Sequence, residues 1–282
     1  MNTNIIIFII ILIILIYGFT YSFLYKDYNQ APKKIWTYWH NSDIPKTVKM
    51  CMEGWKKYNP EYEIILLTKK NFFSYVNIPI EISSHPNFND SSARFSDLVR
   101  IYALAEHGGI WIDGSILLKA PLDWLFPKYA EFSGFYLESF TKTTPVIENW
   151  FIACNKGSPF IKLWKDEFTN IANYVTVEKY VESRKNLGVD FEKINDPIYL
   201  AMHVAAQKVL QIDKYPLDSL ILRKAEDGPF KYLVDAKWDS EKALRLACSN
   251  KKYQFPIMKM RGAERNVLEK EPDLSQSICE WI

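Results

Sequence analysis

The hydrophobic positions of this chain fall into two zones. Ile5 to Tyr25 is a run of 21 residues without a charge, and Ile5 to Ile16 contains only Ile, Leu and Phe. A helix of that length spans about 30 Å, the thickness of a bilayer's hydrocarbon core. A signal peptide is the alternative, but Met1–Asn4 carries no Lys or Arg, and the aromatic end of the run suits a membrane interface. We therefore predict an uncleaved, single-pass transmembrane anchor over 1–26, a tether over 27–33 and one domain over 34–282.

The side of the membrane is left open. Lys26, Lys33 and Lys34 follow the run and nothing basic precedes it, which favours a cytosolic domain. The tripeptide Asn89-Asp90-Ser91 is a glycosylation acceptor only if the domain is lumenal, as in a eukaryotic secretory pathway.

After the anchor, short apolar runs alternate with segments of helical periodicity. Strands are predicted at 34–39, 62–67 and 109–112, and helices at 47–58, 69–76 and from Ser91 or Ser92 to His107, with Gly108 ending the last. Residues 85–90 read as a loop. Later we expect strands at 132–137, 150–153 and 254–259, and helices at 159–172 and 197–210. This alternation predicts an α/β domain with a mixed, mostly parallel sheet.

Composition narrows the function classes. Charged residues make up 24% and aromatic residues 15%, which excludes a disordered chain. No second apolar run reaches 18 residues, so a polytopic membrane protein is excluded as well. The net charge is +2 with both signs mixed, and we expect no nucleic-acid partner.

Two groups of polar residues suggest chemistry. Arg94, Asp97 and Arg100 are spaced by three on a predicted helix and share a face, where guanidinium groups suit phosphate and a carboxylate suits sugar hydroxyls. The alternative is a surface ion pair. A short strand then brings Asp113 to its carboxyl end, where α/β sheets bind ligands. Gly114 lets the backbone approach a ligand, and Asp113 with Ser115 offers oxygen ligands for Mg²⁺ or Mn²⁺. A simple Asp-Gly turn between strands is the alternative here.

These residues resemble the capsular polysaccharide synthesis proteins, relatives of the family 32 glycosyltransferases and of the sugar-transferring domain of large clostridial toxins. The resemblance lies in the segments at 35–39, 96–100, 108–115, 149–152 and 156–159. It implies a GT-A fold, a UDP- or GDP-sugar donor, a glycan or glycolipid acceptor and a retaining hexosyl transfer. A catalytically degenerate relative that binds a nucleotide-sugar or a glycan is the alternative, because Ser115 replaces the second Asp of an Asp-x-Asp pair.

The resemblance also assigns roles. Trp39, or else Trp36, stacks on the nucleobase, and Asp97 holds ribose or donor-sugar hydroxyls. Arg100 faces the sugar or the diphosphate, and Asp113 binds a Mn²⁺ or Mg²⁺ on which dependence is uncertain. Residues 256–262 resemble the family's C-terminal segment and add Lys259 and Arg261 near the diphosphate. His203, a lone histidine in a predicted helix, is interpreted as structural. No general base is named.

Overall fold

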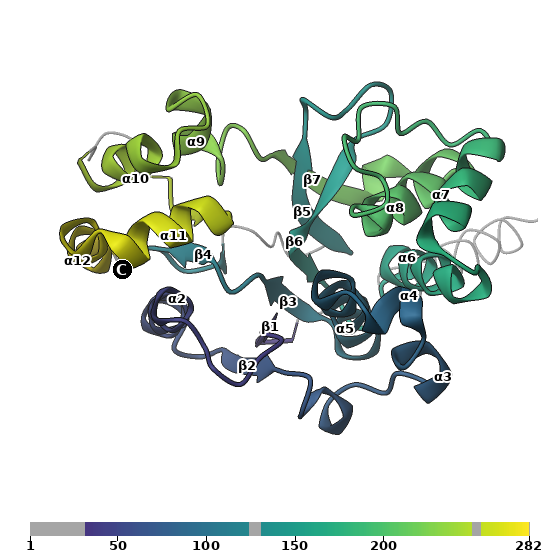
Figure 1. Ribbon diagram of the computed structural model, residues 1–282, viewed down its shortest axis with the longest axis horizontal. Helices are drawn as coiled ribbons and strands as arrows, with labels where there is room; N and C mark the ends of the chain where they lie inside the picture. Colours follow the sequence, from purple (N-terminus) through teal and green to yellow (C-terminus); the bar gives the residue numbers. More distant parts are fainter. Residues whose placement is uncertain (1–31, 124–130, 250–254, 282) are drawn as a thin grey trace, which may run out of the picture.

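The computed structural model describes residues 32–123, 131–249 and 255–281 (Figure 1). The predicted anchor at 5–25 and most of the tether lie outside these residues. Within the described ranges, no helix combines the length and the apolar character that crossing a membrane requires.

The centre of the fold is a mixed sheet with the strand order β2-β1-β3-β6-β5-β7. Its strands are β1 (Lys34–Tyr38), β2 (Glu63–Leu67), β3 (Gly109–Ile112), β5 (Phe132–Leu137), β6 (Val146–Cys154) and β7 (Leu220–Lys224). β1 pairs in parallel with β2 and β3, and β5 pairs in parallel with β7, whereas β6 is antiparallel to both of its neighbours. The predicted α/β class with a mixed, mostly parallel sheet is confirmed.

Helices cover one face of this sheet and enclose the larger hydrophobic core (Figure 1). They are α3 (Ile80–Ser83), α4 (Pro86–Asn89), α5 (Ser92–His107), α6 (Pro159–Thr169), α7 (Val177–Asn186) and α8 (Ala201–Gln211). Phe95, Leu98 and Trp164 are fully buried in this core, as their apolar spacing on the helices predicts.

The other face carries a second core, built partly from the C-terminal residues (Figure 1). Its elements are α2 (Lys46–Tyr58), β4 (Ile116–Leu118), α9 (Lys231–Asp235), α10 (Ser240–Ser249), β8 (Ile257–Lys259), α11 (Gly262–Lys270) and α12 (Pro272–Trp281). β4 and β8 form an antiparallel pair, in which Ile116 lies opposite Lys259. This pairing brings the end of the chain next to the turn after β3.

Helix α5 begins and ends where its sequence predicts. The Ser91 side chain accepts a hydrogen bond from the Arg94 backbone N–H at 3.3 Å, which caps the first turn. Gly108 ends the helix with φ of +68°, and a Cβ atom there would lie 2.4 Å from the Lys156 nitrogen. The chain then passes directly into β3 and reaches Asp113.

Several predicted elements were wrong. The helix expected at 69–76 is only a 3₁₀ turn at Phe72–Ser74, because the Asn71 side chain bonds the backbone of Thr68 and Leu66 instead. The expected loop at 85–90 contains α4. The helix expected from Pro197 begins at Ala201, after a turn in which the Asp196 carboxylate accepts from the Tyr199 N–H at 3.0 Å.

Candidate functional site

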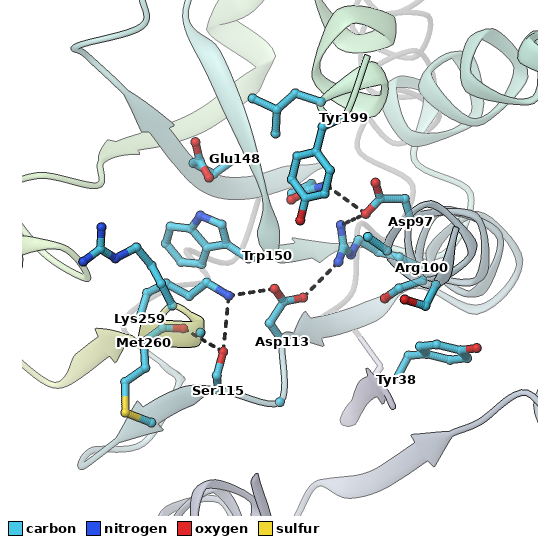
Figure 2. Close-up of a pocket in the computed structure, with 18 of the residues that line it drawn as sticks. Tyr38, Asp97, Arg100, Asp113, Ser115, Glu148, Trp150, Tyr199, Lys259 and Met260 are labelled. Carbon is cyan, nitrogen blue, oxygen red and sulfur yellow. Dashed lines mark hydrogen bonds and ion pairs between the residues drawn. The ribbon is translucent and has the colours of Figure 1, made fainter. Parts of the chain in front are cut away.

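A cavity of about 620 Å³ opens where the N-terminal half of α5, the turn after β3, β6, α8 and the β8–α11 connection meet (Figure 2). Its volume is typical of small-molecule sites. The sequence-predicted residues on its wall are Trp39, Asp97, Arg100, Asp113, Gly114, Ser115, Lys259 and Arg261.

Asp113 is the most highly connected of these residues. Its Oδ1 accepts hydrogen bonds from Arg100 Nη2 at 2.9 Å and Trp111 Nε1 at 3.0 Å, and its Oδ2 accepts from Lys259 Nζ at 2.8 Å (Figure 2). Its carbonyl accepts from the Ile116 N–H at 3.1 Å, so it also starts a turn between β3 and β4. Both interpretations of Asp113-Gly114 therefore hold: the residues form a turn, and the turn presents a carboxylate to the cavity.

The two cations determine the protonation state of Asp113. Burial alone would raise the pKa of its carboxyl, but Lys259 and Arg100 together with their hydrogen bonds lower this pKa to about 2. Asp113 is therefore ionised at neutral pH and holds both cations at the cavity wall.

Arg100 links Asp113 to a second carboxylate. Its Nη1 donates to Asp97 Oδ1 at 2.5 Å, and the Asn149 amide donates to the same oxygen at 3.0 Å. Burial raises the pKa of Asp97 above its usual value, although Arg100 acts in the opposite direction. The Arg100 guanidinium also lies 4.9 Å from the ring of Trp111. The polar face of α5 is thus part of a buried network, not a surface ion pair.

The β8–α11 connection supplies the opposite wall. Lys259 Nζ lies 3.5 Å from Ser115 Oγ, and that hydroxyl donates to the Met260 carbonyl at 2.8 Å. Arg261 reaches the cavity, but its Nη2 is 2.7 Å from Glu264 Oε1, and its backbone and side chain form a capping box at the start of α11. Arg261 is therefore held mainly by its own helix, whereas Lys259 points at Asp113.

The predicted metal ligands do not fit a divalent cation in this arrangement. Each Asp113 oxygen already faces a positive group, and the Ser115 hydroxyl is directed to a carbonyl. Mg²⁺ requires several oxygen ligands in near-octahedral geometry, and at least one is normally a free carboxylate. In the described part of the chain, no three His, Cys, Asp or Glu side chains are grouped to hold a metal. Lys259 instead brings its charge to the position where the sequence predicted an ion.

The two tryptophans proposed for base stacking lie in different surroundings. Trp39 follows β1, lines the cavity and has the Arg265 guanidinium 5.6 Å from its ring. Trp36 is 1% exposed, donates from Nε1 to the Gly108 carbonyl at 2.9 Å and stacks on His107. Trp36 is a core residue, so the alternative that placed it on a nucleobase was wrong.

Arg94 and Gly114 also differ from expectation. The Arg94 guanidinium donates to the carbonyls of Asn87 and Ile198 at 2.8 and 3.4 Å and does not line the cavity. It lies about 120° around α5 from Arg100, which is enough to turn it toward α4. A Cβ on Gly114 would lie 3.0 Å from Val48 and 3.6 Å from Trp39, so packing on α2 also requires this glycine.

Five further cavity residues were not assigned from sequence: Glu148, Asn149, Trp150, Tyr199 and His203. Asn149 and Trp150 lie in a segment that carries the family resemblance, which was the available signal. His203 was interpreted as a satisfied structural residue, yet its buried Nδ1 has no hydrogen-bond partner among the described residues.

Known proteins with related sequences or structures are sugar transferases. The O-glycosyltransferase braB of Annulohypoxylon truncatum is 24% identical over 271 residues, and the match covers 79% of this chain and 63% of that relative. The chain thus spans less than two thirds of the curated relative's length.

Solved structures with some likeness have low scores. The PaToxG glycosyltransferase is 16% identical with a TM-score of 0.39, over 67% of this chain and 79% of its own. The ligand-free glycosyltransferase domain of the YGT toxin is 11% identical with a TM-score of 0.42, over 86% and 90%. The apo-form glycosyltransferase GlyE of Streptococcus pneumoniae TIGR4 is 13% identical with a TM-score of 0.43, over 89% and 63%. The family match, and not these likenesses, therefore decides the assignment.

That match covers more than half of the chain. The family described as capsular polysaccharide synthesis protein matches residues 16–183, which include β1, all of α5, Asp113 and Asn149. The chain belongs to the capsular polysaccharide synthesis protein family.

Proposed function

We propose that this protein is a glycosyltransferase of GT-A type that moves a hexose from a UDP- or GDP-sugar to a glycan or glycolipid acceptor in capsule-type polysaccharide synthesis. The family membership and the O-glycosyltransferase named among its relatives support this reaction class.

One observation carries the proposal: Arg100 and Lys259 flank Asp113 on the wall of a cavity of small-molecule size. The side chains of both cations are at least 88% buried, so their charges are only weakly screened by water. A diphosphate placed beside Asp113 accepts hydrogen bonds from the donors of Arg100 and Lys259 that the carboxylate does not use. The carboxylate holds these cations in place before the donor arrives.

The other walls suit the rest of a nucleotide-sugar. Trp39 offers an aromatic face to the nucleobase, next to Arg265. Asp97 uses Oδ1 for Arg100 and Asn149, and its other oxygen is available to hydroxyls of the ribose or the hexose. Base, hydroxyl and phosphate groups thus each have a complementary side chain.

In the transfer step, the bond from the anomeric carbon to the diphosphate oxygen breaks and its electron pair stays on that oxygen. An acceptor hydroxyl oxygen bonds the anomeric carbon and releases its proton. Fixed positive groups at the leaving oxygen stabilise this transition state, by about 3–4 kcal/mol for one well-placed donor. Arg100 and Lys259 fill that role. We propose retention at the anomeric carbon, as the family resemblance implies.

We also propose that residues 5–25 anchor the protein in a membrane, with the catalytic domain on the cytosolic side. The uncharged run of 21 residues supports the anchor, and Lys26, Lys33 and Lys34 support the orientation. Full-length protein should be released from membranes by detergent but not by carbonate. Protease added outside intact cells or vesicles should leave the domain uncut, and cleavage would place it on the other side.

The reaction is tested with full-length protein in detergent and a panel of UDP- and GDP-sugars, scored by released nucleoside diphosphate. The proposal predicts release with at least one donor and loss of release in Asp113→Asn. Donor binding without release or transfer, unchanged by Asp113→Ala, would favour the degenerate binding relative. That alternative is motivated by Ser115, whose hydroxyl is directed to the Met260 carbonyl.

A further inference from the structure

Strand β6 is irregular where it reaches the cavity. Gly134 of β5 lies opposite Ile152, and Tyr136 lies opposite Ile147, so β5 advances two residues while β6 advances five. The additional residues of β6 include Glu148, Asn149 and Trp150, and all three line the cavity. Such bulges redirect side chains and are common beside active sites.

Two of these residues leave hydrogen-bonding capacity unused. The Glu148 side chain is 7% exposed, and its Oε2 is 4.0 Å from His203 Nε2, beyond hydrogen-bond distance. Over residues 32–123, 131–249 and 255–281, neither His203 Nδ1 nor Trp150 Nε1 has a hydrogen-bond partner, and both atoms are buried. Because burying a polar group without a partner is unfavourable, these groups suggest a ligand that is absent from the folded chain alone.

The chemistry of the three groups selects the ligand. The carboxylate accepts, the indole N–H donates, and the imidazole can do either according to its tautomer. A sugar hydroxyl both donates and accepts, so it satisfies such neighbours. A phosphate would be repelled by Glu148.

The position of these groups separates them from the diphosphate side of the cavity. Lys259 Nζ lies 5.9 Å from the ring of Trp150, and in Figure 2 that ring lies between Lys259 and Glu148. Apolar Leu137 and Phe140 line the same cavity and can contact the carbon face of a sugar ring.

We propose that Glu148, His203 and Trp150 form a subsite that binds the hydroxyls of a sugar ring. The inference rests on the proposed glycosyltransferase function and adds a place for the sugar beside the diphosphate. The ring can belong to the donor hexose or to the acceptor, which present the same hydroxyl chemistry.

The test uses full-length Glu148→Gln and His203→Gln, with Glu182→Gln as the matched control. Glu182 is exposed on α7 and pairs only with Lys179, far from the cavity wall. Three quantities are measured: the affinity for UDP and GDP, the KM for UDP-glucose, UDP-galactose or GDP-mannose in hydrolysis without acceptor, and the KM for acceptor in transfer.

We expect Glu148→Gln to raise a sugar-dependent KM about tenfold or more, because a hydrogen bond to a charged group is lost. Affinity for UDP and GDP should stay at the wild-type value. A higher KM in hydrolysis assigns the subsite to the donor hexose, and a higher KM for acceptor alone assigns it to the acceptor. Glu182→Gln should match wild type in every assay.

Stability provides an independent readout. Since the Glu148 carboxylate is buried without a hydrogen bond, Glu148→Gln should melt at the wild-type temperature or above it, whereas a structural role predicts a lower melting temperature. If Glu148→Gln fails to fold, that role is supported and the subsite is overturned. Wild-type KM values in Glu148→Gln and His203→Gln, or an equal loss of UDP affinity, would also overturn it. Wild-type protein that binds neither UDP nor GDP would instead contradict the proposed function itself.

Discussion

Lys259 and Asp113 are 146 residues apart in sequence, yet Lys259 Nζ lies 2.8 Å from Asp113 Oδ2. The antiparallel pairing of β4 with β8 creates this contact, because it places Lys259 opposite Ile116, three residues after Asp113. The carboxylate that the sequence assigned to a metal is thus neutralised by two side chains of the chain itself, Lys259 and Arg100.

This ion pair predicts that donor use does not need a divalent cation. UDP binding by calorimetry and nucleoside diphosphate release should be the same in EDTA and in Mn²⁺. Lys259→Met should lower kcat by about 10²- to 10³-fold, since one fixed positive donor at the leaving oxygen is lost. Lys242→Met on exposed α10 is the control and should behave as wild type. Release that stops in EDTA and returns with Mn²⁺ would contradict this assignment of Lys259.

Trp39 and Trp36 should respond in opposite ways to substitution. Trp39→Ala should weaken UDP binding by ~1–3 kcal/mol through the loss of one stacking face, with little change in melting temperature. Trp36→Ala should destabilise the fold by ~3–5 kcal/mol, because the side chain is buried and bonded to Gly108. Calorimetry and thermal melts separate the two effects, and normal UDP affinity in Trp39→Ala would remove Trp39 from the base site.

Arg94 and Arg100 form a matched pair on one helix. Arg100→Lys should lower turnover by about a hundredfold or more, because lysine cannot bridge Asp97 and Asp113 and still face the diphosphate. Arg94→Lys should lower stability by about 1 kcal/mol, since hydrogen bonds to Asn87 and Ile198 are weakened, and should leave UDP affinity unchanged. Equal losses of turnover in both variants would indicate that the Arg100 effect arises from folding.

Acid should remove a defined part of the stability. The pKa of Asp113 falls from its ordinary 3.8 to about 2 in the folded protein. The unfolded chain therefore takes up this proton first as the pH falls. The ionised carboxylate stabilises the fold by about 2 kcal/mol above pH ~4, and this contribution is lost between pH ~4 and ~2.

Denaturant unfolding of wild type and Asp113→Asn at several pH values measures this term. The difference in unfolding free energy between the two proteins should be constant from neutral pH to about pH 4 and should shrink below it. A difference that does not change down to pH ~2 would mean that Asp113 is not held ionised by its neighbours.

The sequence predicted local features well and the assembly of the site only in part. Ser91, Gly108 and the periodicity of α5 are local signals, so the helix and the strand that brings Asp113 to the cavity could be read directly. The bulge in β6 and the β4–β8 pairing depend on partners far along the chain, and no nearby residue encodes them. For that reason Glu148 and His203 were missed, and Lys259 was placed near the diphosphate but not on Asp113.

The most direct measurement is a crystal structure of the protein with UDP, grown in the presence of EDTA. The account predicts the diphosphate within hydrogen-bond distance of Lys259 Nζ and an Arg100 guanidinium nitrogen, with the base against the ring of Trp39. UDP bound elsewhere, or a diphosphate that leaves the Lys259–Asp113–Arg100 contacts without a phosphate neighbour, would contradict it.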